Sequence, residues 1–450
     1  MTVPEFILQS IPDSFQEEFA ALQEAHINEA VVSVRMNPAK AETPSFQGDS
    51  IPWCAHGYYL QERPLFTADP LFHAGVYYVQ EASSMFLAEA LKQWLPQQPG
   101  MRVLDLCASP GGKSTLTVAQ LPEDALLLSN EVIGTRVNTL VENAVKWGFD
   151  NQWISNNDAR DFAKLENFFD VVLVDAPCSG SGLFRKMPDY TKEIKAEDIS
   201  FCAARQERIL ADVLPCLKKN GLLIYMTCSF SEQENEGLLD TLCETQELET
   251  ISLTIPEAWG IAQTRSAQHA AYGYRFFPHR LRGEGFFLAG FRKTNGEERL
   301  ELSSKSNHRN TASQFQSWVQ TNNKLVLSMK DMYFLIHEGH APLLEYLQKK
   351  LKLVKKGVLL GKIAGKDFIP DHELAMYSGR AKGVPRVDLN RQEAILYLKK
   401  ETLPPLTETV QLGWLLVCFQ GYPLGWIKNL GKRVNNYYPS AYRIMSKNIV

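Results

Sequence analysis

The chain has 450 residues, of which 45% are hydrophobic and 22% are charged. This length corresponds to about two to four domains, and the composition excludes a disordered or fibrous chain. No apolar stretch approaches the ~18 residues of a membrane span, so we expect no membrane contact. The first ten residues lack the basic segment and cleavage pattern of a secretion signal, and we expect a cytoplasmic location.

The net charge of −4 conceals an asymmetry along the chain. Residues 321–450 hold 20 Lys and Arg against 10 Asp and Glu, which leaves 27 of 47 basic and 41 of 51 acidic residues for residues 1–320. A basic C-terminal region on an acidic body indicates contact with a polyanion. A solvated basic face without a partner explains the same count.

Residues 1–75 predict a small module of helix and strand, with a helix over residues 17–30 and a strand over residues 30–36. A helix over residues 79–94 follows, and strands then alternate with helices. The predicted strands are residues 102–106, 125–129, 153–155, 170–175, 222–226 and 286–291, and the predicted helices are residues 134–147, 199–217 and 232–242. The apolar run from Val171 to Val174 is typical of a strand buried on both faces of a parallel sheet. Residues 76–292 therefore predict a doubly wound, Rossmann-like α/β domain.

Polar residues over 293–320 predict a linker, and residues 321–450 predict a β-rich region with a strand at 358–363 and a helix at 392–398. Aromatic residues stand among basic ones near its end. This mixture fits RNA, whose bases stack on rings and whose phosphates bind Lys and Arg. Some of the rings, such as Trp414, also suit a β-rich core. Lys428, Lys432 and Arg433 are the better candidates for RNA contact, because they lie in a polar, glycine-flanked stretch.

Eight cysteines stand at positions 54, 107, 178, 202, 216, 228, 243 and 418. No pair forms Cys-x-x-Cys and none has zinc-finger spacing with His, so we expect no metal site. In a reducing compartment most of them are expected to be core thiols, with room for one or two catalytic ones.

A glycine-rich segment, Asp105 to Ser114, follows a predicted strand and opens a helix. A phosphate-binding P-loop would need glycine where Cys107 stands, and the dinucleotide pattern Gly-x-Gly-x-x-Gly is absent. Glu131 ends the next strand, where an acid can bind two ribose hydroxyls, and Asp158 follows the third strand, where a side chain can meet an adenine. These features fit S-adenosylmethionine, although Glu131 and Asp158 could also be plain surface acids.

Two cysteines follow the carboxyl ends of strands that we expect to be neighbours. Cys178 lies in Asp-Ala-Pro-Cys-Ser-Gly beginning at Asp175, and Cys228 lies in Thr-Cys-Ser. Open α/β sheets keep their chemistry at these ends, although two buried core thiols are the plain alternative. A thiolate that adds to C6 of cytosine makes C5 nucleophilic toward a sulfonium methyl group, and a base must then remove the C5 proton.

These motifs resemble those of the RNA 5-cytosine methyltransferases of the Sun/nucleolar-protein type. The resemblance rests on the Asp105–Ser114 loop, the Asp175 and Cys228 motifs, Glu234-Asn235-Glu236, and Arg275-Phe276-Phe277-Pro278-His279. It covers roughly residues 30–292. The ending, Gly421 to Pro439, resembles a bacterial branch that methylates small-subunit (16S) ribosomal RNA and carries a PUA-like RNA-binding domain.

The resemblance implies a role for each matching residue. Cys228 would be the nucleophile, Cys178 would release the product, and Asp175 would contact the cytosine near the cofactor. The methionine end of S-adenosylmethionine would be lined by Cys107, Ala108, Ser109, Pro110, Gly111, Gly112 and Lys113. Glu131 would bind the ribose and Asp158 the adenine. Arg185 or Lys186 could meet RNA phosphate, unless they are ordinary surface charges.

The resemblance implies an enzyme that acts on ribosomal RNA. We expect the target base to be flipped out, since a stacked cytosine hides both faces, and we expect a monomer, since nothing in the sequence indicates a coiled coil. The same chemistry on tRNA is an alternative. In a DNA-type cytosine enzyme Cys178 would attack instead, and an adenine-N6 enzyme would need Asp/Asn-Pro-Pro-aromatic at Asp175. A non-catalytic ribosome-assembly factor would bind RNA without either cysteine.

Overall fold

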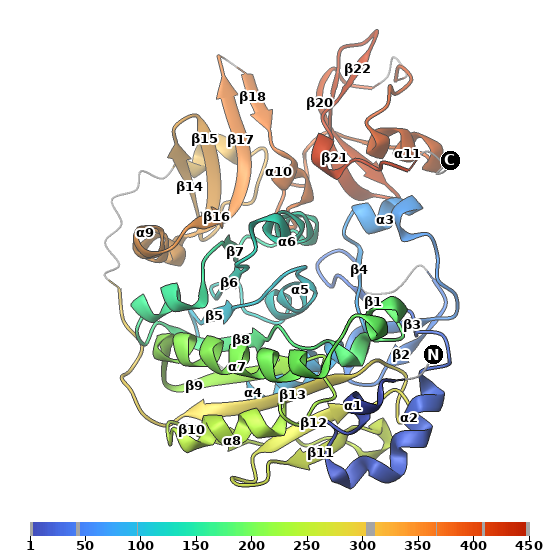
Figure 1. Ribbon diagram of the computed structural model, residues 1–450. Coiled ribbons are helices and arrows are strands. Elements are labelled where there is room, and N and C mark those ends of the chain that lie inside the picture. Colours follow the sequence, from blue (N-terminus) through green and yellow to red (C-terminus); the bar gives the residue numbers. More distant parts are fainter. Residues whose placement is uncertain are drawn as a thin grey trace.

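The computed structural model describes residues 3–41, 46–96, 98–302, 311–365, 367–406 and 410–446. Within these ranges the strands form one ten-stranded sheet and three four-stranded sheets (Figure 1). The large sheet occupies the middle of the chain, one small sheet precedes it, and two follow it. This arrangement confirms the predicted class, an α/β domain between an N-terminal module and a β-rich C-terminal region.

The N-terminal module has a four-stranded sheet of order β2-β3-β1-β4. In the chain, two short helices precede this sheet and a third lies before its last strand. Its elements are α1 (Glu5–Leu8), α2 (Phe19–Ala25), β1 (Ser33–Met36), β2 (Gly48–Ile51), β3 (Cys54–Leu60), α3 (Pro70–His73) and β4 (Tyr77–Val79). The predicted helix over residues 17–30 is shorter, because residues up to Glu18 form a 3-10 helix and α2 ends at Ala25.

The prediction of one helix over residues 79–94 was wrong. Val79 ends a strand that pairs with β1, and helix α4 begins only at Leu87 (Leu87–Trp94). Between them the Glu81 carboxylate accepts hydrogen bonds from the backbone N–H groups of Ser83 and Ser84, both at 2.8 Å. These bonds cap the start of a 3-10 helix over Ser83–Phe86, which leads into α4.

The central sheet has the order β11-β12-β13-β9-β8-β5-β6-β7-β16, and β10 pairs with β13. Strands β5 to β9 are parallel, and the chain order reverses between β5 and β8. A crevice is expected outside the carboxyl ends at such a reversal. The strands are β5 (Arg102–Asp105), β6 (Leu126–Asn130), β7 (Gln152–Ser155), β8 (Phe169–Asp175), β9 (Leu217–Thr227), β10 (Leu248–Ile251), β11 (Ala262–Arg265), β12 (Tyr272–Phe276), β13 (Phe286–Lys293) and β16 (Leu353–Lys355).

Helices cover both faces of this sheet, as a doubly wound fold requires. Helices α4 and α5 (Gly112–Val118) pack on one face, and α7 (Ala196–Val213) and α8 (Glu236–Glu244) pack on the other. Helix α6 (Gly134–Trp147) matches its predicted bounds. The six predicted strands are confirmed, although β9 begins earlier, at Leu217. Strands β10 to β12 were not predicted.

The C-terminal region forms two further sheets, β14-β15-β17-β18 and β19-β20-β21-β22. Their elements are β14 (Lys324–Met329), β15 (Met332–His337), α9 (Ala341–Lys350), β17 (Val358–Ala364), β18 (Asp367–Pro370), α10 (His372–Met376), β19 (Arg386–Asp388), α11 (Arg391–Lys399), β20 (Gly413–Phe419), β21 (Tyr422–Asn429) and β22 (Val434–Asn436). The predicted strand and helix here are β17 and α11. Of the predicted linker, residues 303–310 lie outside the described residues, and Ala312–Phe315 is a 3-10 helix.

The C-terminal region packs against the rest of the chain at two places. Strand β16 leaves its own region and pairs with the edge strand β7, while the leucines of α9 join the core of the central sheet. The last sheet shares a hydrophobic core with the N-terminal module, beside α3 (Figure 1). Both contacts fix the C-terminal region to the central sheet and the N-terminal module.

Candidate active site

The loop between β5 and α5 lies at the reversal point of the sheet. Gly111 has a φ of 109°, a conformation that side-chain-bearing residues rarely adopt, and α5 begins at the next residue. Before it, the buried Asp105 accepts a hydrogen bond of 2.5 Å from the Ser114 hydroxyl. Burial raises the pKa of Asp105 to about 7. The loop therefore has a fixed shape and leaves N–H groups of the helix start available to a ligand.

Glu131 and Asp158 lie at the carboxyl ends of β6 and β7. Glu131 is buried and accepts a hydrogen bond of 2.8 Å from the backbone N–H of Ile133. Asp158 is more open, with 45% of its side chain exposed, and accepts from the backbone N–H of Arg160. Both acids line the same cavity as Cys107, Ser109 and Asp175, so the structure brings five of the ten predicted cofactor residues together. The other five, Ala108, Pro110, Gly111, Gly112 and Lys113, are not among its lining residues.

This cavity of about 410 Å³ continues from the two acids to both cysteines of the predicted catalytic pair. Its lining residues include Leu106, Cys107, Ser109, Glu131, Asp158, Asp175, Cys178 and Cys228. Such a volume is of the size that holds a small-molecule ligand. One opening thus connects the predicted cofactor residues with the predicted reacting residues.

The two cysteines meet because their strands are neighbours. Strands β8 and β9 run parallel with Asp175 opposite Met226, so the residues that follow them emerge side by side. The Sγ atoms of Cys178 and Cys228 are 3.1 Å apart. The hydrogen bond with Cys228, together with burial, raises the pKa of Cys178 well above its ordinary value. Cys178 therefore retains its proton at neutral pH.

Asp175, which lines the cavity, makes an ion pair with Lys113. The Lys113 Nζ lies 2.8 Å from the Asp175 Oδ2. Burial lowers the pKa of Lys113, but the charge of Asp175 outweighs it and the pKa is raised on balance. Lys113 therefore remains a cation, and it directs one end of the glycine-rich loop toward the strand that carries Cys178.

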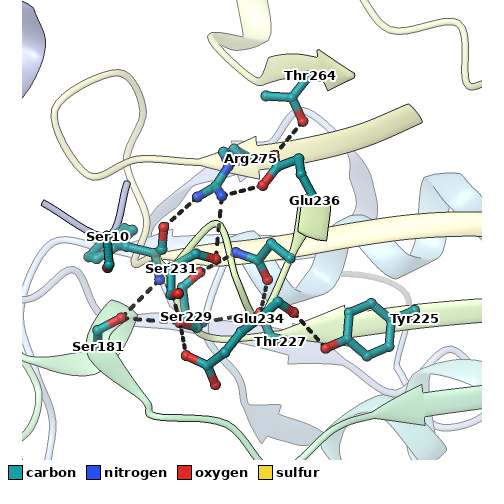
Figure 2. A network of polar contacts seen from close by, with 12 residues as sticks. Ser10, Ser181, Tyr225, Thr227, Ser229, Ser231, Glu234, Glu236, Thr264 and Arg275 are labelled. Atoms are coloured by element: carbon teal, nitrogen blue, oxygen red, sulfur yellow. Dashed lines mark hydrogen bonds and ion pairs between the residues drawn. The ribbon is translucent and has the colours of Figure 1, made fainter. Parts of the chain in front are cut away.

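A buried carboxylate, Glu234, joins the two cysteine loops (Figure 2). Its Oε1 accepts hydrogen bonds from the Ser179 backbone N–H at 2.8 Å and from Gln206 at 3.1 Å. Its Oε2 accepts from the Ser179 and Ser229 hydroxyls, both at 2.5 Å. Because these serines directly follow Cys178 and Cys228, one acid fixes the spacing of the two thiols.

The sequence had marked Glu234 only as part of a family motif. Its role depends on serines 55 and five residues away in the chain. The only sequence signal was an acid shortly after the Thr-Cys-Ser motif.

Arg275 supports the same loop and is drawn above it in Figure 2. It is buried against Glu236, with Nε 2.7 Å from the Glu236 Oε1, and its Nη1 donates to the Phe230 carbonyl at 2.7 Å. The backbone just after Cys228 is therefore held by a buried ion pair as well as by Glu234.

The residues proposed for RNA contact fall into two groups. Arg185 is buried in an ion pair of 2.9 Å with Glu284 and also donates to the Gly283 carbonyl, so its guanidinium braces the fold, while Lys186 is exposed. Lys428 lies over the Trp414 ring, and Lys432 and Arg433 are exposed in the turn between β21 and β22. That turn is at the far end of the molecule from β8 and β9 (Figure 1).

Among the described residues, no group of three or more His, Cys, Asp or Glu side chains is placed to hold a metal ion. No helix in the described ranges has the length and apolar character to cross a membrane.

Comparison with known proteins adds family models for three segments of the chain. The N-terminal domain of 16S rRNA methyltransferase RsmF matches residues 3–82, 16S rRNA methyltransferase RsmB/F matches residues 92–292, and the methyltransferase RsmF PUA domain matches residues 384–444.

Curated relatives and solved structures agree with these models. The chain is 29% identical to the ribosomal RNA small subunit methyltransferase F of Enterobacter sp. strain 638, over 95% of both chains. Its identity to that of Shewanella sp. strain MR-7 is 28%, over 90% of both. A methyltransferase homolog from Pyrococcus horikoshii matches 64% of this chain and 93% of its own, with 28% identity and a TM-score of 0.54. The NSun6 structure from the same organism, at 19% identity and a TM-score of 0.54, covers 65% of this chain and 98% of its own and shares the fold.

Proposed function

Because this chain belongs to the RsmB/F methyltransferase family, we propose that it methylates C5 of a cytosine in small-subunit ribosomal RNA. The observation that carries the proposal is the pair of thiols 3.1 Å apart in the cavity that also contains Glu131 and Asp158. A cytosine base placed against the thiols would face a methyl donor bound between the acids and the glycine-rich loop.

The methyl donor of this family is S-adenosylmethionine, and the cavity fits it. When bound, it supplies an electrophilic methyl group on a positively charged sulfur. Glu131 is a buried acid suited to two ribose hydroxyls. Val132 and Ile133 are exposed apolar residues on the same wall and suit an adenine face. Asp158 lies where it can accept from an amino group, and Cys107 to Lys113 suit the methionine end.

We assign attack to Cys228 and product release to Cys178. The Cys228 sulfur would form a bond to C6, and the electron pair of the C5–C6 double bond would move toward C5, which takes the methyl group. A base then takes the C5 proton, the electron pair of the C5–H bond re-forms the C5–C6 double bond, and Cys228 leaves C6 as a thiolate. The positions of the two residues support this division, because Cys228 stands in the Thr-Cys-Ser motif directly after β9 and Cys178 follows Pro177 after β8, with the two Sγ atoms 3.1 Å apart.

Asp175 is proposed to contact the cytosine ring. It ends β8 immediately before the Cys178 loop and lines the same cavity. Its ion pair with Lys113 fixes the carboxylate at the junction of the cofactor and base ends of the cavity. A hydrogen bond at the ring N3 would favour addition of the thiolate to C6.

Ribosomal RNA is proposed as the substrate on two grounds. The relatives are small-subunit ribosomal RNA methyltransferases by name, and residues 384–444 match the PUA domain of that branch. The basic balance of residues 321–450 is consistent with a polyanion. Such a substrate places the protein in the cytoplasm. We also propose that residues 1–75 and 321–450 contact the RNA around the active site.

The test is an adduct trapped on a denaturing gel. Cys178→Ala, Cys228→Ala and the double variant Cys178→Ala/Cys228→Ala are incubated with S-adenosylmethionine and 16S RNA from cells that lack the enzyme. Cys243→Ala, a half-buried cysteine on α8, is the matched control. We expect an RNA adduct with Cys178→Ala alone, and its sequence would identify the nucleotide.

Other outcomes would contradict specific parts of the proposal. Adduct in Cys228→Ala but not in Cys178→Ala would exchange the two roles. Methyl transfer by the wild type onto tRNA only would replace the substrate. RNA binding by the wild type that survives loss of both cysteines, without methyl transfer, would favour an assembly factor.

A further inference from the structure

Helix α7 forms one wall of the active-site cavity. Arg205, Arg208, Ile209 and Asp212 line the cavity and share one face of the helix, because residues three, four and seven apart face the same side. Phe201 lies one turn before Arg205 on that face. Its side chain is 69% exposed, although phenylalanine is usually buried. The α7 face therefore begins with an exposed ring and continues with two cations.

The two α7 arginines have no partner to explain their position. Within the described ranges, no hydrogen bond or ion pair joins the side chain of Arg205 or Arg208 to another residue. Arg136, which also lines the cavity, differs because it donates to the Ser109 carbonyl at 2.8 Å and lies 3.7 Å from Glu131. An arginine that only stabilised the fold would be expected to have such contacts.

The segment that faces α7 at the cysteine end also exposes an apolar side chain. Met187 is 53% exposed and lines the cavity together with Tyr190. Both belong to the stretch between Cys178 and the start of α7, so this part of the rim lies close to the thiols. Exposed apolar side chains beside free guanidinium groups are the combination that binds single-stranded RNA.

We propose that Phe201, Arg205 and Arg208 hold the RNA strand that flanks the target cytidine. The arginines bind the phosphates on either side of the flipped nucleotide, and Phe201 stacks on the neighbouring base. This inference rests on the proposed function and adds a positioning site for its substrate. A flipped base brings its own phosphates to the rim of the cavity, which is where these residues stand.

The cofactor is a less suitable ligand for this face. S-adenosylmethionine carries one carboxylate, whereas α7 offers two guanidinium groups one turn apart and a ring that faces solvent. Asp212 is the one carboxylate that the cavity-lining part of α7 presents, so positive charge predominates there. A chain of phosphates matches two spaced cations better than a single carboxylate does.

The test compares RNA and cofactor affinity in the full-length protein. The variants are Arg205→Ala/Arg208→Ala, Arg205→Lys/Arg208→Lys, Phe201→Ala and Phe201→Tyr. Lys92→Ala on α4 is the control, because Lys92 is a 73% exposed cation on the opposite face of the sheet. Binding of a single-stranded RNA that contains the methylated site is measured at several salt concentrations, together with KM for each substrate.

We expect the double alanine variant to lose roughly ten- to hundred-fold in RNA affinity. The salt slope, which is the slope of log affinity against log salt concentration, should become shallower by about 1.4. The lysine pair should keep most of the salt slope. Phe201→Ala should lose roughly ten-fold at an unchanged salt slope, and Phe201→Tyr should restore binding. KM for S-adenosylmethionine should stay within about two-fold of wild type in all of them, because the cofactor residues are untouched.

RNA affinity equal to that of Lys92→Ala would overturn the inference while leaving the proposed function intact. A raised KM for S-adenosylmethionine with unchanged RNA affinity would assign the arginines to the cofactor instead. If the wild-type protein itself neither binds nor methylates the RNA, the proposed function fails first.

Discussion

Replacing Glu234 by alanine should separate the two cysteine loops without disturbing the cofactor residues. The carboxylate accepts from the Ser179 backbone N–H and from the hydroxyls of Ser179 and Ser229. A hydrogen bond to a charged group contributes about 1.5–3 kcal/mol to stability. At the lower value, the two hydroxyl bonds together contribute about 3 kcal/mol. If that energy maintains the thiol spacing in the transition state, kcat falls roughly 100-fold, since 1.36 kcal/mol corresponds to tenfold.

The assay is methyl transfer at saturating substrates, with cofactor binding and thermal unfolding measured in parallel. Glu234→Gln keeps the shape and one acceptor oxygen, so we expect an intermediate loss of about tenfold. Glu232→Ala, two residues earlier and exposed, is the control. KM for S-adenosylmethionine should not change. A folded Glu234→Ala protein whose kcat equals that of Glu232→Ala would refute the reasoning.

Three further predictions concern the surroundings of the site. Asn156→Ala removes hydrogen bonds to the carbonyls of the loop after β6 and from a lysine just before β16, so KM for S-adenosylmethionine should rise about tenfold at constant kcat. Lys350→Ala, which loses contacts with Lys164 and Tyr346 outside the cavity, should leave KM unchanged, and equal KM values for the two variants would contradict this. Arg275→Met leaves the buried Glu236 without its partner and should lower the free energy of unfolding by about 3–5 kcal/mol, measured by thermal unfolding. Adding Glu236→Gln should restore part of this stability, and no recovery would argue against a paired charge. Asp105 has a raised pKa of about 7, so the folded state binds a proton that the unfolded chain releases between roughly pH 4 and pH 7, and stability falls as pH rises through that window. Asp105→Asn should remove this pH dependence. The difference in unfolding free energy between the variant and the wild type should therefore change between about pH 4 and pH 7 and be constant above pH 7.

Much of the catalytic domain could be predicted from local patterns. The apolar run of β8 indicated a strand buried on both faces, and Asp105 to Ser114 indicated a turn into a helix. The expectation that the Cys178 and Cys228 loops are adjacent followed from parallel strands having their carboxyl ends on one edge, and the structure places the two Sγ atoms 3.1 Å apart. The same patterns failed at residues 79–86, where the carboxylate of Glu81 replaces helical hydrogen bonds.

Local sequence patterns were sufficient to predict the α/β class, the glycine-rich loop and the two cysteines, because backbone period, glycine conformation and strand ends depend on neighbouring residues. Which charges are paired depended on the three-dimensional fold. Arg185 turned out to be buried against Glu284, 99 residues away, and Glu234 turned out to join the cysteine loops. It also decided that β16 extends the central sheet beside β7. Such partners are chosen by packing between distant segments, and the free energy of burying a charge or an edge strand is set by that packing alone.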